Sequence, residues 1–185
     1  MSDTVWASYT QVDPLPQARC YASTCVYTNQ LYVIGGCDER GEPVDTVLCF
    51  DGRTWSNGPK LNHPRSAPTL TIVNQRIFVI GGIGAQQCPL DSIEMFEGTS
   101  WEKCPSLPEP LMGVSAVEIS AERAFIVGGM AKDTNPRDSV RQITWTFSQE
   151  RPKWDNFPPM PTARYNAHLG DNIARFIKSH SLPYF

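Results

Sequence analysis

The stretch that decides the fold is Leu31-Tyr32-Val33-Ile34-Gly35-Gly36, a short apolar run that ends in two glycines. The same pattern returns as Ile77-Phe78-Val79-Ile80-Gly81-Gly82 and as Ala124-Phe125-Ile126-Val127-Gly128-Gly129. The first glycines of the pairs stand at positions 35, 81 and 128, so the intervals are 46 and 47 residues. A period of this length indicates a repeat architecture in which each repeat is one supersecondary unit.

Further landmarks follow each glycine pair in phase. An aspartate stands nine residues after the second glycine, and a tryptophan stands ten residues after the first two aspartates. In the third unit the tryptophan arrives six residues late, which predicts an insertion between Asp138 and Trp154, in the turn 149–153. The landmarks are Asp45, Asp91 and Asp138, followed by Trp55, Trp101 and Trp154.

The pattern continues beyond each tryptophan. A leucine or methionine stands six residues later, and an arginine or leucine ten residues later. These pairs are Leu61 with Arg65, Leu107 with Leu111, and Met160 with Arg164. Tyr9, Leu15 and Arg19 have the same spacing, so the chain is predicted to open with the last strand of one unit.

Each unit is predicted to hold four short strands, because turn residues separate β-prone runs and helical periodicity is not sustained. In the first unit the expected strands are about 20–27, 31–35, 45–50 and 53–57. Four-stranded antiparallel sheets that repeat every 40 to 50 residues or so are typical of propeller blades. The sequence therefore predicts an all-β fold.

The repeated residue types suit such blades. Paired glycines at the end of a buried strand permit positive φ and a close approach of two backbones. The tryptophans and the aromatic residue of each glycine-ending strand supply apolar area for sheet faces that pack on neighbouring blades. We therefore expect Trp55 and Trp101 to be largely buried.

The order of apolar strand, Gly-Gly, spacer, tryptophan and Leu-Pro or Met-Pro turn resembles the kelch repeat, over about residues 5–168. Within this family the chain is most similar to the kelch domain-containing protein 8 group. That similarity rests on Gly82-Ile83-Gly84-Ala85-Gln86-Gln87-Cys88-Pro89-Leu90 and on Met112-Gly113-Val114-Ser115 with Gly128-Gly129-Met130. The resemblance implies a β-propeller whose loops bind protein partners.

The number of units predicts an open arc, because closed propellers have about four to eight blades. The expected units are 1–19 (outer strand of an incomplete blade and crossing), 20–61, 62–107 and 108–160 (three four-stranded blades), 161–173 (start of a fourth blade) and 174–185 (divergent tail). The tail departs from the family, as in a truncated isoform or an incomplete gene model. Apolar faces at both ends would favour self-association through unclosed blade edges.

Composition argues against several classes of function. The net charge is −3 and no basic stripe is present, which disfavours nucleic acid as a partner. No basic N-terminal region precedes an apolar run, and no stretch of about 18 apolar residues occurs, so secretion and membrane insertion are disfavoured. We expect a cytoplasmic protein whose reduced thiols serve as small core or strand residues. The alternative is that Cys37 or Cys88, each in a loop, is exposed and redox-reactive.

Catalytic and metal-binding patterns are missing from the sequence. It contains no nucleophile elbow, P-loop or dinucleotide-binding glycine motif. His63, His168 and His180 lie far apart, and none has a His, Cys or carboxylate companion at zinc-ligand spacing. The sequence thus predicts a protein without enzymatic activity, metal or cofactor.

The candidate binding residues are the arginines that begin the inner strands, with Leu111 in their place in the third unit. They are Arg19, Arg65 and Arg164. In kelch propellers that bind peptides, arginines at similar positions line the central face and hold acidic motifs. The resemblance implies the same role for these three arginines, and bidentate guanidinium geometry is suited to it. The alternative is an arginine that forms a salt bridge within its own loop. The loops that would share this rim are 37–44, 83–90 and 130–137.

The favoured interpretation is a non-catalytic scaffold that holds protein partners, by acidic segments among others, through its propeller loops. A first alternative is a substrate receptor of a ubiquitin ligase, although those receptors carry a helical region ahead of the propeller and this repeat begins within ten residues of Met1. The remaining alternatives are an enzyme built on a propeller and a truncated isoform without independent function.

Overall fold

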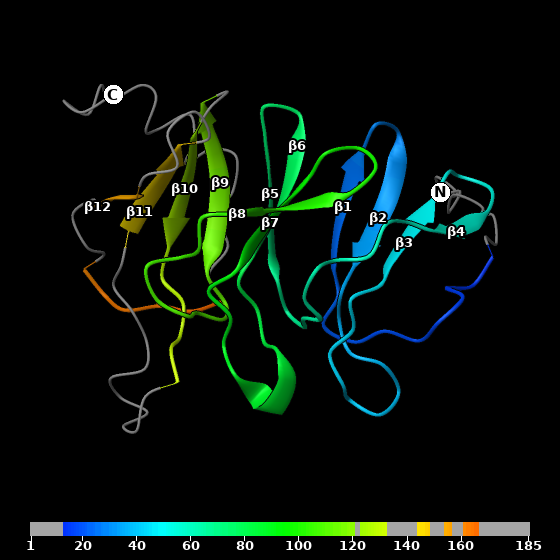
Figure 1. Cartoon of the computed structure of the whole chain (residues 1–185), viewed down its shortest axis with the longest axis horizontal. Helices are drawn as coiled ribbons and strands as arrows, with labels where there is room; N and C mark the ends of the chain where they lie inside the picture. Colours follow the sequence, from blue (N-terminus) through cyan, green and yellow to red (C-terminus); the bar gives the residue numbers. More distant parts are fainter. Residues whose placement is uncertain (1–12, 121–122, 133–143, 149–153, 157–160, 167–185) are drawn as a thin grey trace, which may run out of the picture.

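The computed structural model of the chain describes residues 13–120, 123–132, 144–148, 154–156 and 161–166. These residues form three four-stranded sheets that stand side by side, each with its strands in chain order and antiparallel (Figure 1). The sheets make an open arc rather than a closed ring. The prediction of an all-β propeller fragment with four-stranded blades is confirmed.

The elements are as follows. The first sheet holds β1 (Ser23–Tyr27), β2 (Gln30–Ile34), β3 (Val47–Phe50) and β4 (Trp55–Asn57). The second holds β5 (Thr69–Val73), β6 (Arg76–Ile80), β7 (Ile93–Phe96) and β8 (Trp101–Cys104), with a single 3-10 turn, η1 (Ala85–Gln87), between β6 and β7. The third holds β9 (Ser115–Ser120), β10 (Arg123–Val127), β11 (Thr144–Ser148) and β12 (Trp154–Asn156). Within the described ranges, no helix has the length and apolar character that crossing a membrane requires.

Two-residue turns set the register of the β1–β2 and β5–β6 hairpins. Thr28 and Asn29, and likewise Asn74 and Gln75, have φ between 45° and 63°. Positive φ at both central residues is the hallmark of the type I′ turn, whose twist matches that of the flanking strands. The hairpins therefore pair Tyr27 with Gln30 and Val73 with Arg76, directly beside their turns.

The middle sheet is covered on both faces, as a propeller blade requires. Ile77 and Val79 of β6 join a core with the first sheet, whereas Phe78 and Ile80 join a core with the third. Because side chains alternate along a strand, this apolar run of four serves two interfaces at once. The inner strand β5 lies against both β1 and β9, which brings the inner edges of the three blades together.

The glycine pairs occur where one blade meets the next. Gly35 has a φ of +62°, and a Cβ there would stand 2.5 Å from the carbonyl oxygen of Arg65, at the start of the second unit. Gly81 has the same relation to the carbonyl oxygen of Leu111, again at 2.5 Å. A side chain at either position would collide with the neighbouring backbone, which explains the repeated glycine.

Each tryptophan joins its blade to the segment before it. The indole Nε1 of Trp101 donates to the Pro59 carbonyl oxygen at 2.9 Å, and that of Trp154 donates to the Ser106 carbonyl oxygen at 2.8 Å. Trp55 makes the corresponding bond to the Asp13 carbonyl oxygen at 3.0 Å. These bonds hold successive units in place, a role that the sequence did not reveal.

The predicted burial of Trp101 is confirmed, and Trp55 is less buried than Trp101. Trp101 is 5% exposed within the core between the first and second sheets. Trp55 is half-buried, since no described sheet packs on its side of the first blade. Less apolar surface is exposed on that outward face than was predicted, because Val33 and Leu48 are buried. Within the described part of the sheet, Val26 is the one large hydrophobic residue that is exposed.

The insertion in the third unit lies mostly outside the predicted turn. Ile34 pairs with Val47 and Ile80 with Ile93, an offset of 13 residues in both cases, whereas Val127 pairs with Thr144, an offset of 17. Four extra residues therefore precede β11, inside the predicted interval between Asp138 and Trp154 but ahead of the predicted turn. The predicted turn 149–153, Asp138 itself and the tail 174–185 lie outside the described residues.

Candidate functional site

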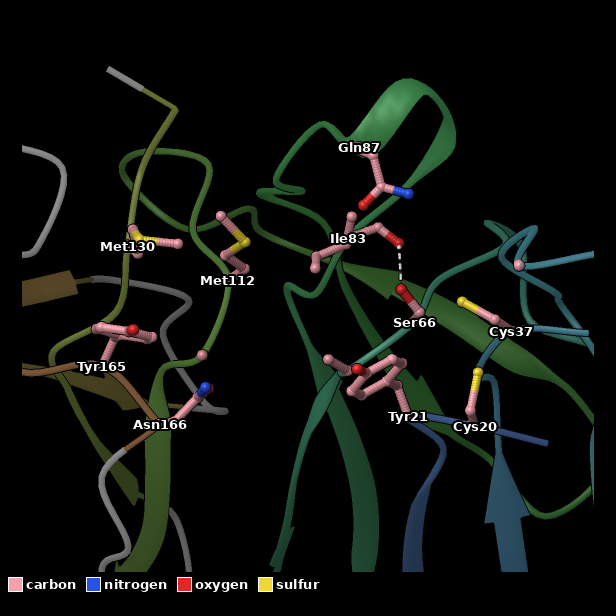
Figure 2. Close-up of a pocket in the computed structure, with 13 residues that line it drawn as sticks. Cys20, Tyr21, Cys37, Ser66, Ile83, Gln87, Met112, Met130, Tyr165 and Asn166 are labelled. Carbon is pink, nitrogen blue, oxygen red and sulfur yellow. Dashed lines mark hydrogen bonds between the residues drawn. The ribbon is translucent and has the colours of Figure 1, made fainter. Parts of the chain in front are cut away.

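A pocket of about 400 Å³ lies where the inner ends of the three blades converge (Figure 2). Each unit contributes an isolated β-bridge between the residue three positions before its inner strand and the residue after its glycine pair. These bridges are Cys20 with Cys37, Ser66 with Ile83, and Met112 with Met130, and all six residues line the pocket. The same position of the repeat therefore supplies the pocket wall three times.

Left-handed backbone recurs among the residues that line this pocket. Four lining residues have φ angles of 55°, 46°, 63° and 49°, and they directly follow Cys20, Ser66, Met112 and Tyr165: they are Tyr21, Ala67, Gly113 and Asn166. A left-handed conformation costs an L-residue other than glycine on the order of 1 kcal/mol or more, and it persists where the surroundings fix it. Strained residues cluster at ligand clamps and other functional sites, so this pattern supports a binding role.

Hydrogen bonds between blades fix these strained residues. The amide of Ala67 donates to the carbonyl oxygen of Tyr21 at 2.7 Å, which ties the second unit to the first. The amide of Asn166 donates to the carbonyl oxygen of Gly113 at the same distance, which ties residues 161–166 to the third unit. The pocket rim is thus set by backbone contacts between successive repeats.

The pocket wall is apolar and rich in sulfur. Its lining includes Cys20, Cys37, Met112, Met130 and Ile83, which Figure 2 shows coming from several units. Tyrosines and a few neutral polar groups complete the wall, and none of the described residues that line it is charged. Methionine adapts to irregular apolar partners, so this wall is suited to an apolar or aromatic side chain rather than to an anion.

Arg65, one of the three predicted binding residues, is wholly buried. Its guanidinium donates to the carbonyl oxygens of Gly81 and Ser92 at 2.8 and 2.9 Å and forms an ion pair with Glu94 at 2.6 Å. Both partners of the ion pair are 0% exposed. The prediction that Arg65 holds a partner's acidic segment is therefore wrong, because its donors are already engaged inside the second blade.

Glu94 is a buried charged residue that the sequence analysis did not identify. Its carboxylate accepts bonds from the Asn62 amide at 2.6 Å, the Asn62 side chain at 2.9 Å and the His63 amide at 3.1 Å. Burial lowers the pKa of Arg65 from its usual value, while the charge and hydrogen bond of Glu94 oppose that effect. These contacts join residues 62–65, which lead from the first blade to the second, to Glu94 on β7. The role of Glu94 is therefore structural.

The other two arginines are not brought together with Arg65. The Arg19 guanidinium donates to Thr46 of the first blade and to the Gln17 side chain, the latter at 2.6 Å, and burial lowers its pKa. Arg164 is exposed, and its carbonyl oxygen accepts from the Gly129 amide at 2.9 Å. A shared arginine cluster at the rim is therefore not formed.

The predicted residues miss the pocket wall by one position. Cys20, Ser66, Met112 and Tyr165 line the pocket and directly follow Arg19, Arg65, Leu111 and Arg164. In an extended chain, neighbouring side chains point to opposite sides. Where one residue points into the blade interior, the next residue therefore points into the pocket. This alternation could have identified the residue after each predicted arginine as a residue of the pocket wall.

Groups suited to a metal ion do not converge in the described part of the chain. No three His, Cys, Asp or Glu side chains there are arranged to bind a cation together. His63 is 44% exposed and stands 3.6 Å from Glu94, whose carboxylate is already occupied. His168 and His180 lie outside the described residues.

Two segments of the chain, residues 18–62 and 64–108, match the family described as Kelch motif. These two segments are similar to the kelch repeat. They contain the first and second sheets, β1–β4 and β5–β8, and the third sheet has the same strand order. No curated protein matches the chain. The narrower similarity to the kelch domain-containing protein 8 group therefore stays a prediction.

Proposed function

We propose that the chain is a non-catalytic, cytoplasmic scaffold that binds an apolar segment of a protein partner in the pocket between its blades. Kelch repeats are generally protein-interaction modules, and the family is typically non-enzymatic. The observation that carries the proposal is the convergence of repeat-equivalent residues from three blades on one strained, uncharged pocket. The six free cysteines agree with a reducing compartment.

The pocket chemistry favours an apolar segment over the acidic segment that the arginines had suggested. An anion in this pocket would give up its hydration without gaining a cationic partner from the lining, which is unfavourable. An apolar side chain against Met112, Met130 and Ile83 would instead remove apolar surface from water on both sides. The exposed rings of Tyr21 and Tyr165 at the opening could then cover the flanking residues.

A selection from a random-peptide display library tests this proposal. The purified full chain is expected to enrich peptides that share a large apolar or aromatic anchor residue. Replacement of Met112 by glutamate should abolish capture of the enriched peptides, because it places an unpaired charge in the pocket wall.

Val26→Glu is the matched control, since Val26 is 68% exposed on the outward face of the first sheet and does not line the pocket. It should leave capture unchanged. Enrichment of acidic peptides, or equal capture by Met112→Glu and wild type, would contradict the proposal.

A further inference from the structure

The first bridge of the pocket carries two thiols. Cys20 and Cys37 are directly paired across antiparallel chain segments, with amide-to-carbonyl distances of 3.3 and 2.8 Å in the two directions. The equivalent bridges of the other two described units carry Ser66 with Ile83 and Met112 with Met130. Figure 2 shows both cysteines at one side of the pocket. This juxtaposition of thiols is therefore particular to the first unit among the three.

The geometry of such a pair is compatible with a disulfide. Residues that exchange both backbone hydrogen bonds across an antiparallel pair have Cα atoms about 5.5 Å apart. Disulfides form at Cα separations of about 4.4–6.8 Å, and side chains of directly opposed residues project to the same side. The backbone at Cys20 and Cys37 thus already has a spacing at which the two sulfurs can join.

The two thiols differ in access to solvent, which gives them different roles. Cys20 is exposed, whereas Cys37 is buried with 7% of its surface exposed. The burial of Cys37 agrees with the expectation that the cysteines are core or strand residues, and not with the alternative that Cys37 is exposed. An oxidant can therefore reach Cys20 first, and Cys37 lies beside it to complete the reaction.

We propose that Cys20 and Cys37 form a reversible redox pair, a site of disulfide modification in the pocket wall. With a low-molecular-weight disulfide such as oxidised glutathione, the Cys20 thiolate attacks one sulfur and releases one glutathione thiolate. The Cys37 thiolate then attacks the Cys20 sulfur of the mixed disulfide and releases the second. The protein loses two protons and two electrons, and one oxidised glutathione becomes two reduced glutathiones.

Two cysteines at the core between the first and second sheets, Cys25 and Cys49, provide a contrast. Cys25 and Cys49 both flank Tyr32, Cys25 from β1 and Cys49 from β3, so a strand separates them. Burial, with a smaller contribution from Cys49, raises the pKa of the Cys25 thiol to about 11. A thiol that is buried and protonated reacts slowly, so these two cysteines should stay reduced under conditions that oxidise the pocket pair.

Peptide mapping of the folded full chain tests the proposal. The reduced protein is incubated with excess oxidised glutathione, quenched, blocked with N-ethylmaleimide and cleaved with chymotrypsin. Cleavage after Tyr21, Tyr27 and Tyr32 separates Cys20, Cys25 and Cys37 into different fragments. The expected product is a fragment pair joined through Cys20 and Cys37 that dithiothreitol separates.

Cys37→Ser is the matched variant, in which Cys20 should accumulate as a stable glutathione adduct because the second attack is lost. Unchanged circular dichroism would confirm that this variant is folded. The wild-type result alone decides the proposal. If Cys20 of the wild type stays reduced, retains glutathione, or joins a cysteine other than Cys37, the proposal is overturned.

Discussion

Replacing Arg65 with methionine tests the structural role that the fold assigns to this buried cation. The variant keeps a side chain of similar reach but removes the guanidinium 2.6 Å from Glu94. Glu94 would remain 0% exposed with an uncompensated charge, held only by the Asn62 and His63 bonds. Removing one partner of a buried ion pair costs about 3–5 kcal/mol, a large fraction of the roughly 5–15 kcal/mol that stabilises a typical domain.

Urea unfolding followed by tryptophan fluorescence measures this loss as a change in the free energy of unfolding. Arg19→Met is the matched control, because Arg19 has the same place in the repeat but is partly exposed and donates its hydrogen bonds to the neutral side chains of Gln17 and Thr46. Its expected loss is below about 1 kcal/mol. An Arg65→Met loss no greater than that of Arg19→Met would refute the assigned role.

A double variant separates the charge from the packing. The first unit has Leu48 where the second has Glu94, and the third has Leu111 where the second has Arg65. Arg65→Met combined with Glu94→Leu should therefore be more stable than Arg65→Met alone, because no unpaired carboxylate stays buried. A double variant less stable than the single one would show that the carboxylate is needed chiefly by its backbone donors.

The remaining predictions concern glycine, tryptophan and cysteine positions. Gly35→Ala should destabilise the chain more than Gly41→Ala, as measured by urea unfolding, since both have positive φ but only Gly35 has a neighbouring carbonyl within 2.5 Å of the added Cβ. Trp101→Phe should cost about 1 kcal/mol or more, because a buried indole loses its 2.9 Å hydrogen bond, and an unchanged unfolding midpoint would count against this. With iodoacetamide at pH 8, Cys25 should react at least roughly tenfold more slowly than an ordinary thiol of pKa 9.0, because its pKa is about 11 and the smaller thiolate fraction outweighs the higher nucleophilicity of that thiolate. The exposed Cys20 should react faster, and equal rates for the two cysteines in the folded chain would contradict this.

Much of the fold could be predicted because its determinants are local and repeated. The apolar runs, glycine pairs and turn residues of the first two units specify strands that the structure places within a few residues of their expected bounds. The third unit was less predictable, because Asp138 has the right sequence spacing but the strand pairing begins at Thr144. A single side chain does not fix strand register when an insertion lies nearby.

The candidate site was harder to predict for two physical reasons. The side to which Arg65 or Ser66 points depends on strand register, and a shift of one residue reverses it. The left-handed conformations of Tyr21 and Ala67 arise from contacts between units, and neither residue type signals positive φ. Sequence reasoning therefore located the correct chain segments, whereas the pocket required the three-dimensional arrangement.

The central claim is that the uncharged pocket, and not the arginines, binds the partner. Isothermal titration calorimetry with a peptide from the display selection measures it directly, on the wild type, Met112→Glu and Arg19→Met. The account predicts at least a tenfold loss of affinity for Met112→Glu and an unchanged affinity for Arg19→Met, because Met112 lines the pocket and Arg19 does not. Full affinity in Met112→Glu together with lost affinity in Arg19→Met would contradict it.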